Sequence, residues 1–236
     1  MSRQERREEF NGLIIDDVQS FDEDLITHDL CVTGSALLSE DLEADYVQVP
    51  GRLDVNGMIS CDELEVTGRV KCKAGVVIET GEVQGKLTSS GKINAESLNV
   101  TGTLACRASV KAYDVNVPGE LSCVGKLKSE KINVTGKLRV DGSLSAMRLS
   151  VDSPAASYVD EISVDRLIVR KTGGEEDYAL RCSDADCRTA NIAYTRIGSL
   201  SCSAAEIGPG CKIDELIYSG SVSISPEAIV RKVIKL

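Results

Sequence analysis

One tripeptide recurs at a fixed spacing in the middle of the chain, where residues 98–138 read LNVTGTLACRASVKAYDVNVPGELSCVGKLKSEKINVTGKL. Each copy is a valine, a variable residue and a glycine, and successive copies follow one another with a 17-residue period. Outward from this stretch, the full set is Val32–Gly34, Val49–Gly51, Val66–Gly68, Val83–Gly85, Val100–Gly102, Val117–Gly119 and Val134–Gly136. Val151–Ser153 continues the spacing with serine for glycine. A fixed internal period of this kind indicates a solenoid in which each repeat forms one coil.

Apolar and small residues occur in pairs within each repeat, and the two members of a pair are two residues apart. This spacing places both side chains on the same side of a β-strand. One repeat contains the pairs Leu98/Val100, Leu104/Cys106 and Val110/Ala112. From one pair to the next, the steps are six, six and five residues. The pattern predicts an all-β fold, namely a parallel β-helix (β-solenoid) with 17-residue triangular coils.

The repeat divides the chain into four expected regions. Residues 1–15 are expected to form a charged, flexible N-terminal tail, and 16–169 a regular β-solenoid. The pattern is broken over 170–199, where an irregular insert or loop region is expected. Apolar pairs return over 200–236, which should form the C-terminal solenoid coils and the end of the rod. About ten coils stacked ~4.8 Å apart would give a rod on the order of 50 Å long.

The composition favours a core of stacked, uniform layers. There is no Trp, and there are two Phe and six Tyr in 236 residues, whereas an irregular core normally uses aromatic side chains to fill its space. Nine cysteines occur without a CxxC pair and beside a single His, which is too little for a Cys/His zinc site. Cys72, Cys106 and Cys123 occupy the same inward position of successive repeats. They are predicted to be buried packing residues rather than metal ligands or disulfides.

The charge is concentrated near the N-terminus. Residues 11–45 contain ten Asp and Glu and no Lys or Arg, and the whole chain has a net charge of −10. This balance argues against nucleic-acid binding, which needs a basic surface. The acidic stretch is more typical of a solvated end than of a partner site. Residues 1–10 lack the apolar segment of a signal peptide, and no apolar run approaches the ~20 residues of a membrane span. A cytoplasmic location is expected, with peripheral membrane association left open.

Candidate chemical sites are few. Gly-Lys pairs such as Gly85-Lys86 resemble phosphate-binding loops but lack their flanking Gly and Ser or Thr, and they lie at repeat corners. Asn99 and Asn133 begin glycosylation sequons in a chain without a secretory signal, and they are expected to be unmodified. His28, alone in an acidic segment, is more typical of a solvated or capping residue than of a base. We therefore expect no catalytic, cofactor or metal site, no small-molecule substrate and no enzymatic activity.

Two alternatives remain open on the sequence alone. The first is an enzyme on a β-helix platform that acts on carbohydrate or acyl groups. The left-handed hexapeptide β-helix of acyltransferases also has a triangular coil, but it is an 18-residue coil in steps of six, and its base is usually His. Other β-helix enzymes act on polysaccharides, and they usually line a long groove with aromatics and clustered carboxylates. The second alternative is a non-polymerising adapter, whose acidic N-terminal region recruits a basic partner.

The repeating V-T-G-x-L units and the segment IGPGCKIDELIYS (Ile207–Ser219) resemble the bactofilins, a family of polymer-forming bacterial cytoskeletal proteins. The resemblance covers most of the chain from about residue 30. It implies a right-handed coil and nucleotide-independent filaments that form by end-to-end stacking. It also implies a scaffold for envelope, shape or motility machinery, which self-associates or co-assembles with a paralogue and has an envelope protein as a candidate client.

The ends of the predicted rod are the candidate assembly surfaces. Terminal coils of a solenoid have unpaired strand edges, which must be capped or must pair with another molecule. No capping helix is evident in the apolar, β-prone C-terminal segment, and the predicted interface residues are Ile224, Ile229, Val230, Val233 and Ile234. Opposite charges at the two ends favour head-to-tail stacking, whereas the resemblance implies non-polar filaments with like ends together.

Overall fold

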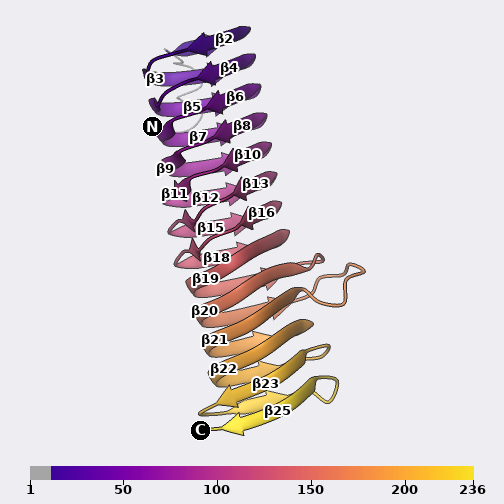
Figure 1. Cartoon of the computed structure of the whole chain (residues 1–236). Helices are drawn as coiled ribbons and strands as arrows, with labels where there is room; N and C mark the ends of the chain where they lie inside the picture. The colour runs from indigo at the N-terminus through magenta and orange to yellow at the C-terminus, as the bar shows by residue number, and fades with distance from the viewer. Residues whose placement is uncertain (1–11) are drawn as a thin grey trace.

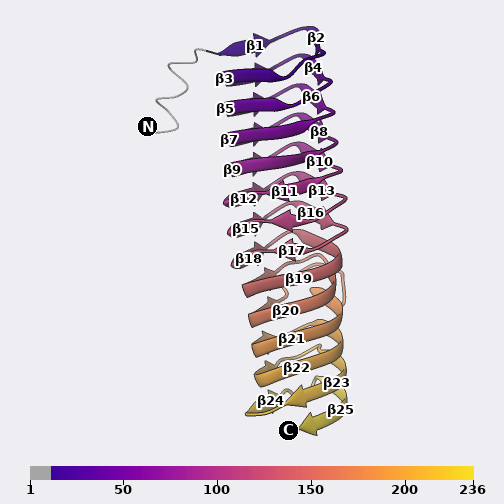
Figure 2. The same cartoon turned by 60° about the vertical axis from the view of Figure 1, so that its left-hand side comes forward.

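The computed structural model describes residues 12–236, and every regular element in this range is a β-strand. The strands form one continuous parallel sheet wound into a rod, with β1 at one end and β25 at the other (Figures 1 and 2). The rod has about 13 turns, which at ~4.8 Å per turn gives a length of about 60 Å. The predicted β-solenoid is therefore confirmed, and it is longer than the ten coils that the repeat suggested.

Short strands make up the N-terminal part of the rod. They are β1 (Leu13–Ile15), β2 (Val18–Phe21), β3 (Leu25–Val32), β4 (Ser35–Leu38), β5 (Leu42–Val49), β6 (Arg52–Val55), β7 (Met58–Val66), β8 (Arg69–Cys72), β9 (Gly75–Val83), β10 (Lys86–Ser89), β11 (Lys92–Asn94), β12 (Ser97–Val100), β13 (Thr103–Cys106), β14 (Val110–Lys111), β15 (Asp114–Val117), β16 (Glu120–Cys123), β17 (Leu127–Lys128) and β18 (Lys131–Val134). The remaining strands, several of them much longer, are β19 (Lys137–Asp152), β20 (Ser157–Arg170), β21 (Leu180–Ile192), β22 (Thr195–Ile207), β23 (Lys212–Tyr218), β24 (Val222–Ile224) and β25 (Ile229–Lys235).

Each coil has three faces, which we name by their inward pairs in one N-terminal coil. The pairs are Leu30/Val32 on face A, Ala36/Leu38 on face B and Leu42/Ala44 on face C. Each of these faces pairs with the same face of the next coil at a 17-residue offset, as in Leu30 with Val47, Ala36 with Leu53 and Leu42 with Ile59. The steps of six, six and five residues are thus confirmed.

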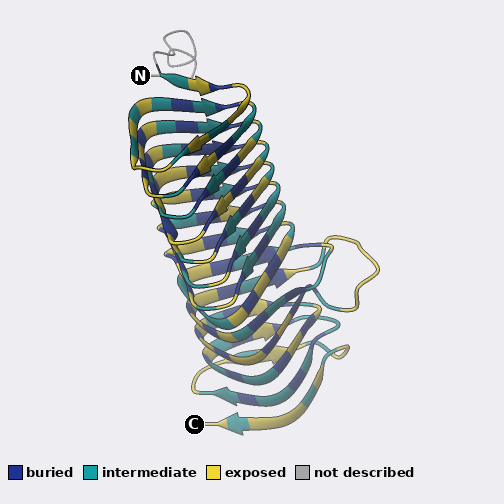
Figure 3. Cartoon of the chain, turned by 45° about the horizontal axis from the view of Figure 1, so that its top comes forward, coloured by how far each residue is buried: buried dark blue, intermediate teal, exposed yellow. Residues whose placement is uncertain are grey.

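Buried residues recur along every coil of the rod (Figure 3), and they are the members of the inward columns. Leu53, Ile59 and Leu104 are fully buried, as are the column members above and below them. Eight of the nine cysteines are buried, and all nine are free thiols. The predicted packing role of the cysteine column is confirmed for Cys72, Cys106 and Cys123, which lie 0–2 % exposed on face B.

The repeat glycines form a column at the corner between faces A and B. A Cβ added at Gly85 would lie 2.1 Å from the carbonyl oxygen of Gly68, and one added at Gly68 would lie 2.1 Å from that of Gly51. These glycines do not have left-handed φ angles. Glycine is needed here because the backbones of successive coils approach too closely for any side chain.

The expected insert over 170–199 is much smaller in the structure. Residues 171–179 leave the strand pattern and project as a loop from the side of the rod (Figure 1), and residues 193–194 form a short corner between β21 and β22. β21 and β22 occupy most of the remainder and belong to the solenoid. The prediction failed here because β21 and β22 pair at a 15-residue offset, as in Leu180 with Thr195, and no longer follow the 17-residue period.

The N-terminal boundary also differs from the prediction. β1 lies within the segment that was expected to be a flexible tail, and its residues pair with β3 at the 17-residue offset, as in Leu13 with Leu30. Residues 1–11 lie outside the described part of the chain. The prediction undercounted the coils because it left out this first coil and those built on β21 and β22.

The change of period takes place at β19 and β20. Face B of β20 pairs with β19 at a 19-residue offset, and faces C and A pair at an 18-residue offset, with a bulge between Val140 and Ser143. Ser153 stands where the next repeat glycine would lie, and its hydroxyl donates a hydrogen bond to the carbonyl of Gly136. The chain then makes a longer corner before β20 starts at Ser157.

Candidate functional site: the open C-terminal coil and the charged faces

Within residues 12–236, no strand covers the outer side of the last coil of the solenoid. β24 pairs with β22 and β25 pairs with β23, and no further described strand pairs with either of them. The outer edges of β24 and β25 therefore present backbone N–H and C=O groups at the end of the rod. This edge is a candidate assembly surface.

The five predicted interface residues lie on this coil but point in two directions. Ile224, Val230 and Val233 continue the inward columns, because they pair with the buried residues Ile207, Ile213 and Leu216 respectively. Ile229 pairs with Lys212 and Ile234 with Ile217, both of which point outward from the rod. The structure therefore brings three of the five together at the end and places the other two on its sides.

The inward side chains of the last coil are much more exposed than those of the coil before it. Leu216 is 0 % exposed, whereas Val233, the next member of the same column, is 49 % exposed. Ile207 is 1 % exposed, whereas Ile224 is 40 % exposed. Both differences arise because Leu216 and Ile207 lie between two coils, whereas no described coil covers Val233 and Ile224. A further coil in register would bury these side chains.

The basic residues of the C-terminal coil are largely engaged within the chain. An oxygen of Asp214 lies 3.0 Å from the Arg231 guanidinium, and Lys232 pairs with Glu215. The Lys235 ammonium lies 6.0 Å from the centre of the Tyr218 ring. The charge contrast between the two ends is consequently weaker than the sequence suggested.

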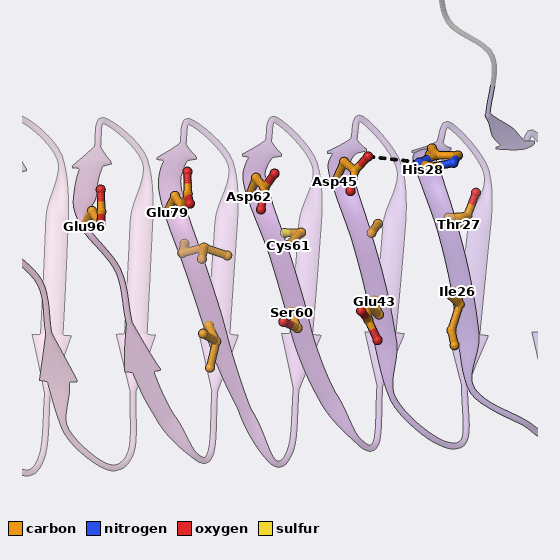
Figure 4. A pocket seen from close by; sticks show the side chains of 13 residues that line it. Ile26, Thr27, His28, Glu43, Asp45, Ser60, Cys61, Asp62, Glu79 and Glu96 are labelled. Atoms are coloured by element: carbon orange, nitrogen blue, oxygen red, sulfur yellow. Dashed lines mark hydrogen bonds and ion pairs between the residues drawn. The ribbon is translucent and has the colours of Figure 1, made fainter.

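A second surface feature is an open groove of about 690 Å³ on the outside of face C. Figure 4 shows His28, Asp45, Asp62, Glu79 and Glu96 in a row along it, one residue from each successive coil. Asp45 Oδ2 lies 3.0 Å from His28 Nδ1. This hydrogen bond and the charge of Asp45 raise the pKa of the exposed His28.

Cys61 is the one thiol that lines this groove. Burial, reinforced by the charges of Asp62 and Glu63, raises its pKa to about 12. The thiol is therefore protonated near neutral pH, and a protonated thiol is a poor nucleophile. Among residues 12–236, no group of three or more His, Cys, Asp or Glu side chains is placed to hold a metal ion.

The sequence-based interpretation missed a basic counterpart on face B. In the coils of β6, β8, β10 and β13, the outward cations of this face are Arg52, Arg69, Lys71, Lys73, Lys86 and Arg107. Summing charge along the chain hides this arrangement, because the coils that start at Gly51, Gly68 and Gly85 each contain both basic and acidic residues. Counting charge by position within the 17-residue repeat would have revealed it, since Arg52, Arg69 and Lys86 each directly follow a repeat glycine.

Comparison with family models, with curated proteins and with solved structures finds no match. Function must therefore be inferred from the geometry of this chain itself. In the described residues there is no helix long and apolar enough to cross a membrane.

Proposed function

We propose that this protein is a structural scaffold that self-assembles end to end into filaments, without nucleotide. The observation that carries the proposal is the open C-terminal coil, where Ile224, Val230 and Val233 end three inward columns and no described coil lies beyond them. The bactofilin resemblance of the sequence supports the same proposal, and it extends it to a cytoplasmic scaffold for envelope, shape or motility machinery.

Both backbone and side chains favour contact at this end. A second molecule that continues the sheet would satisfy the free edge of β25 with backbone hydrogen bonds. It would also bury the half-exposed Val233 and Ile224, and full burial of one such side chain is worth about 1.5–3 kcal/mol relative to full exposure. Small gains at every junction add up along a filament.

Two filament polarities remain compatible with this end. Head-to-tail stacking would add β1–β3 of the next molecule as parallel strands, which continues the existing sheet. Contact between two C-terminal coils through a two-fold axis would pair β25 with its own copy in the antiparallel sense. The ion pairs of Arg231 and Lys232 within the chain remove much of the electrostatic preference for the first arrangement. Subunit polarity in a filament reconstruction distinguishes the two.

The test compares inward and outward residues of the same coil. The Ile224→Asp/Val233→Asp variant places carboxylates on the uncovered columns, and the Ile229→Asp/Ile234→Asp variant places them on the sides. We expect the wild-type protein to pellet and to form filaments in electron micrographs without nucleotide. The inward variant should form no end-to-end filaments at concentrations where the outward variant still does.

A strictly monomeric wild-type protein over a wide concentration range would overturn the proposal. Equal loss of filaments in both variants would instead indicate that the contact lies on the sides of the rod and not at its end. Circular dichroism on each variant checks that the solenoid remains folded, since a last coil can fray without loss of the others.

A further inference from the structure

Charge is sorted by face in the N-terminal part of the rod. On face B, the cations Arg69, Lys71, Lys73, Lys86 and Arg107 are exposed, and none of them makes an ion pair with a described residue. Of the face B cations in these coils, Arg52 alone is paired, with an oxygen of Asp54 2.6 Å from its guanidinium. A band of unneutralised positive charge thus covers this face.

The opposite charge lies along the outer edge of face C. Asp62, Glu79 and Glu96 stand one above another in the row shown in Figure 4, and none of the three makes an ion pair with a described residue. Asp45 continues the row and contacts His28. Carboxylates stacked at the ~4.8 Å spacing of the coils repel one another, as do cations stacked at that spacing on face B.

The two charged columns occupy the same coils. In three successive coils the cation and the carboxylate are ten residues apart, as Arg52/Asp62, Arg69/Glu79 and Lys86/Glu96. The next coil has Thr103 and Tyr113 at these positions, so both columns end together. Because both columns belong to one solenoid, they also share one axial spacing.

We propose that the rods associate side by side, with the basic face B of one copy against the acidic edge of face C of a second copy. Two parallel rods without axial offset place a cation opposite a carboxylate in each of the three coils. Faces B and C are different surfaces, so the contact is heterologous, and each rod can accept one neighbour while it binds another. The association thus yields bundles rather than closed pairs. It uses the sides of the rod and does not depend on the proposed end-to-end contact.

Electrostatic contacts of this kind have a recognisable salt dependence. Exposed ion pairs are individually weak, but a column repeats them along the whole contact. Between about 0.1 M and about 1 M salt the Debye length falls from roughly 10 Å to 3 Å, so bundles should separate into single rods or filaments over this range. End-to-end contacts through apolar side chains should survive the same change.

The test reverses each column separately. Variant one is Arg69→Glu/Lys71→Glu on face B, and variant two is Asp62→Lys/Glu79→Lys on face C. Each alone carries like charge on both surfaces and should lose side-by-side association, whereas an equal mixture should restore it. A matched control is Arg148→Glu/Arg166→Glu, which makes the same charge change on face A and should leave association unchanged.

Bundle width in electron micrographs and sedimentation at low and high salt are the measurements. Repeating them in the Ile224→Asp/Val233→Asp background, where the ends are blocked, separates this contact from filament growth. The proposal is overturned if variant one keeps the wild-type bundle width, or if the mixture fails to restore it. It is also overturned if variant one loses only its binding to vesicles that contain phosphatidylglycerol, because face B would then serve an anionic membrane.

Discussion

The N-terminal half of this rod and the coils of β21 and β22 differ in the length of the corners that join one face to the next. The N-terminal half has a 17-residue coil, and each of its two six-residue steps places three residues between inward side chains, such as Thr33–Ser35, of which Thr33 and Gly34 leave the strand conformation. Its five-residue step keeps the strand unbroken in β3, β5, β7 and β9, of which β7 runs from face C into face A. In the next coils the same step is interrupted, between β11 and β12, β14 and β15, and β17 and β18. In β21 and β22 every step has five residues, which gives a 15-residue coil. One strand then covers all three faces.

The shorter coil also encloses less space. Inward residues of β21 include Ala185, Cys187 and Ala190, where the corresponding columns of the N-terminal half contain larger side chains such as Ile59 and Leu98. Corner length and core volume therefore change together. The comparison teaches that the period of this solenoid is set by how each corner is built, and that the inward side chains follow from it.

The largest effect is expected at the glycine corner of the 17-residue coils. In Gly85→Val the Cβ alone would lie 2.1 Å from the Gly68 carbonyl oxygen, so neighbouring coils must separate. We expect a loss of stability of more than about 4 kcal/mol, or failure to fold. Arg188→Ala, at an exposed two-residue corner of β21, should change stability by less than about 0.5 kcal/mol.

Chemical denaturation of both variants measures this contrast. A Gly85→Val protein that unfolds at the wild-type denaturant concentration would show that the coils can separate at this corner without cost. The glycine column would then have no part in setting the longer period.

The next effect concerns the volume inside each coil type. Leu98→Ala removes a fully enclosed side chain from a 17-residue coil and should cost about 2–5 kcal/mol. Ala190→Leu adds volume to the narrower 15-residue coil and should cost about 1–3 kcal/mol through overpacking. Both costs are measured as shifts of the denaturation midpoint. If Ala190→Leu instead raised that midpoint, the shorter coil would have unfilled space, and its small residues would need another explanation.

How much of the fold could be predicted from the sequence depends on the corner type. The Val-x-Gly corners are visible in the sequence, because close backbone approach demands glycine at a fixed position, and the inward pairs follow from them. The 15-residue coils have no such marker. Leu180/Cys182, Ala185/Cys187 and Ala190/Ile192 do recur every five residues, but the loop 171–179 separates them from the 17-residue period that defined the pattern.

The candidate assembly site, like the fold, could be predicted only in part from the sequence. An apolar last coil could be recognised, and the alternation of a strand could separate Ile229 from Val230. Which of them continues a buried column needed the pairing with β23, because the register changes between Ser157 and Ile207 were hidden in the sequence. The sorting of charge by face depended on the same register.

The smallest effect is expected where neither corner nor core is involved. His28 is exposed, and its pKa is raised by the hydrogen bond and charge of Asp45. Because the folded pKa lies above the unfolded value, the pair stabilises the fold at low pH, and this contribution is lost as the pH rises through the folded pKa. We therefore expect Asp45, one coil away, to raise the pKa of His28 without contributing to the geometry of the coil.

A nuclear magnetic resonance titration can follow this directly, since His28 is the one histidine in the chain. In Asp45→Asn the pKa of His28 should fall toward 6.5, the ordinary value for histidine, while the denaturation midpoint at neutral pH stays the same. Asp41→Asn is less suitable as a control, because Asp41 Oδ1 accepts a hydrogen bond from the Met58 backbone N–H and helps to hold a corner. A marked loss of stability in Asp45→Asn would show that the outward charge rows contribute to coil geometry, and the division between corners, core and surface would have to be redrawn.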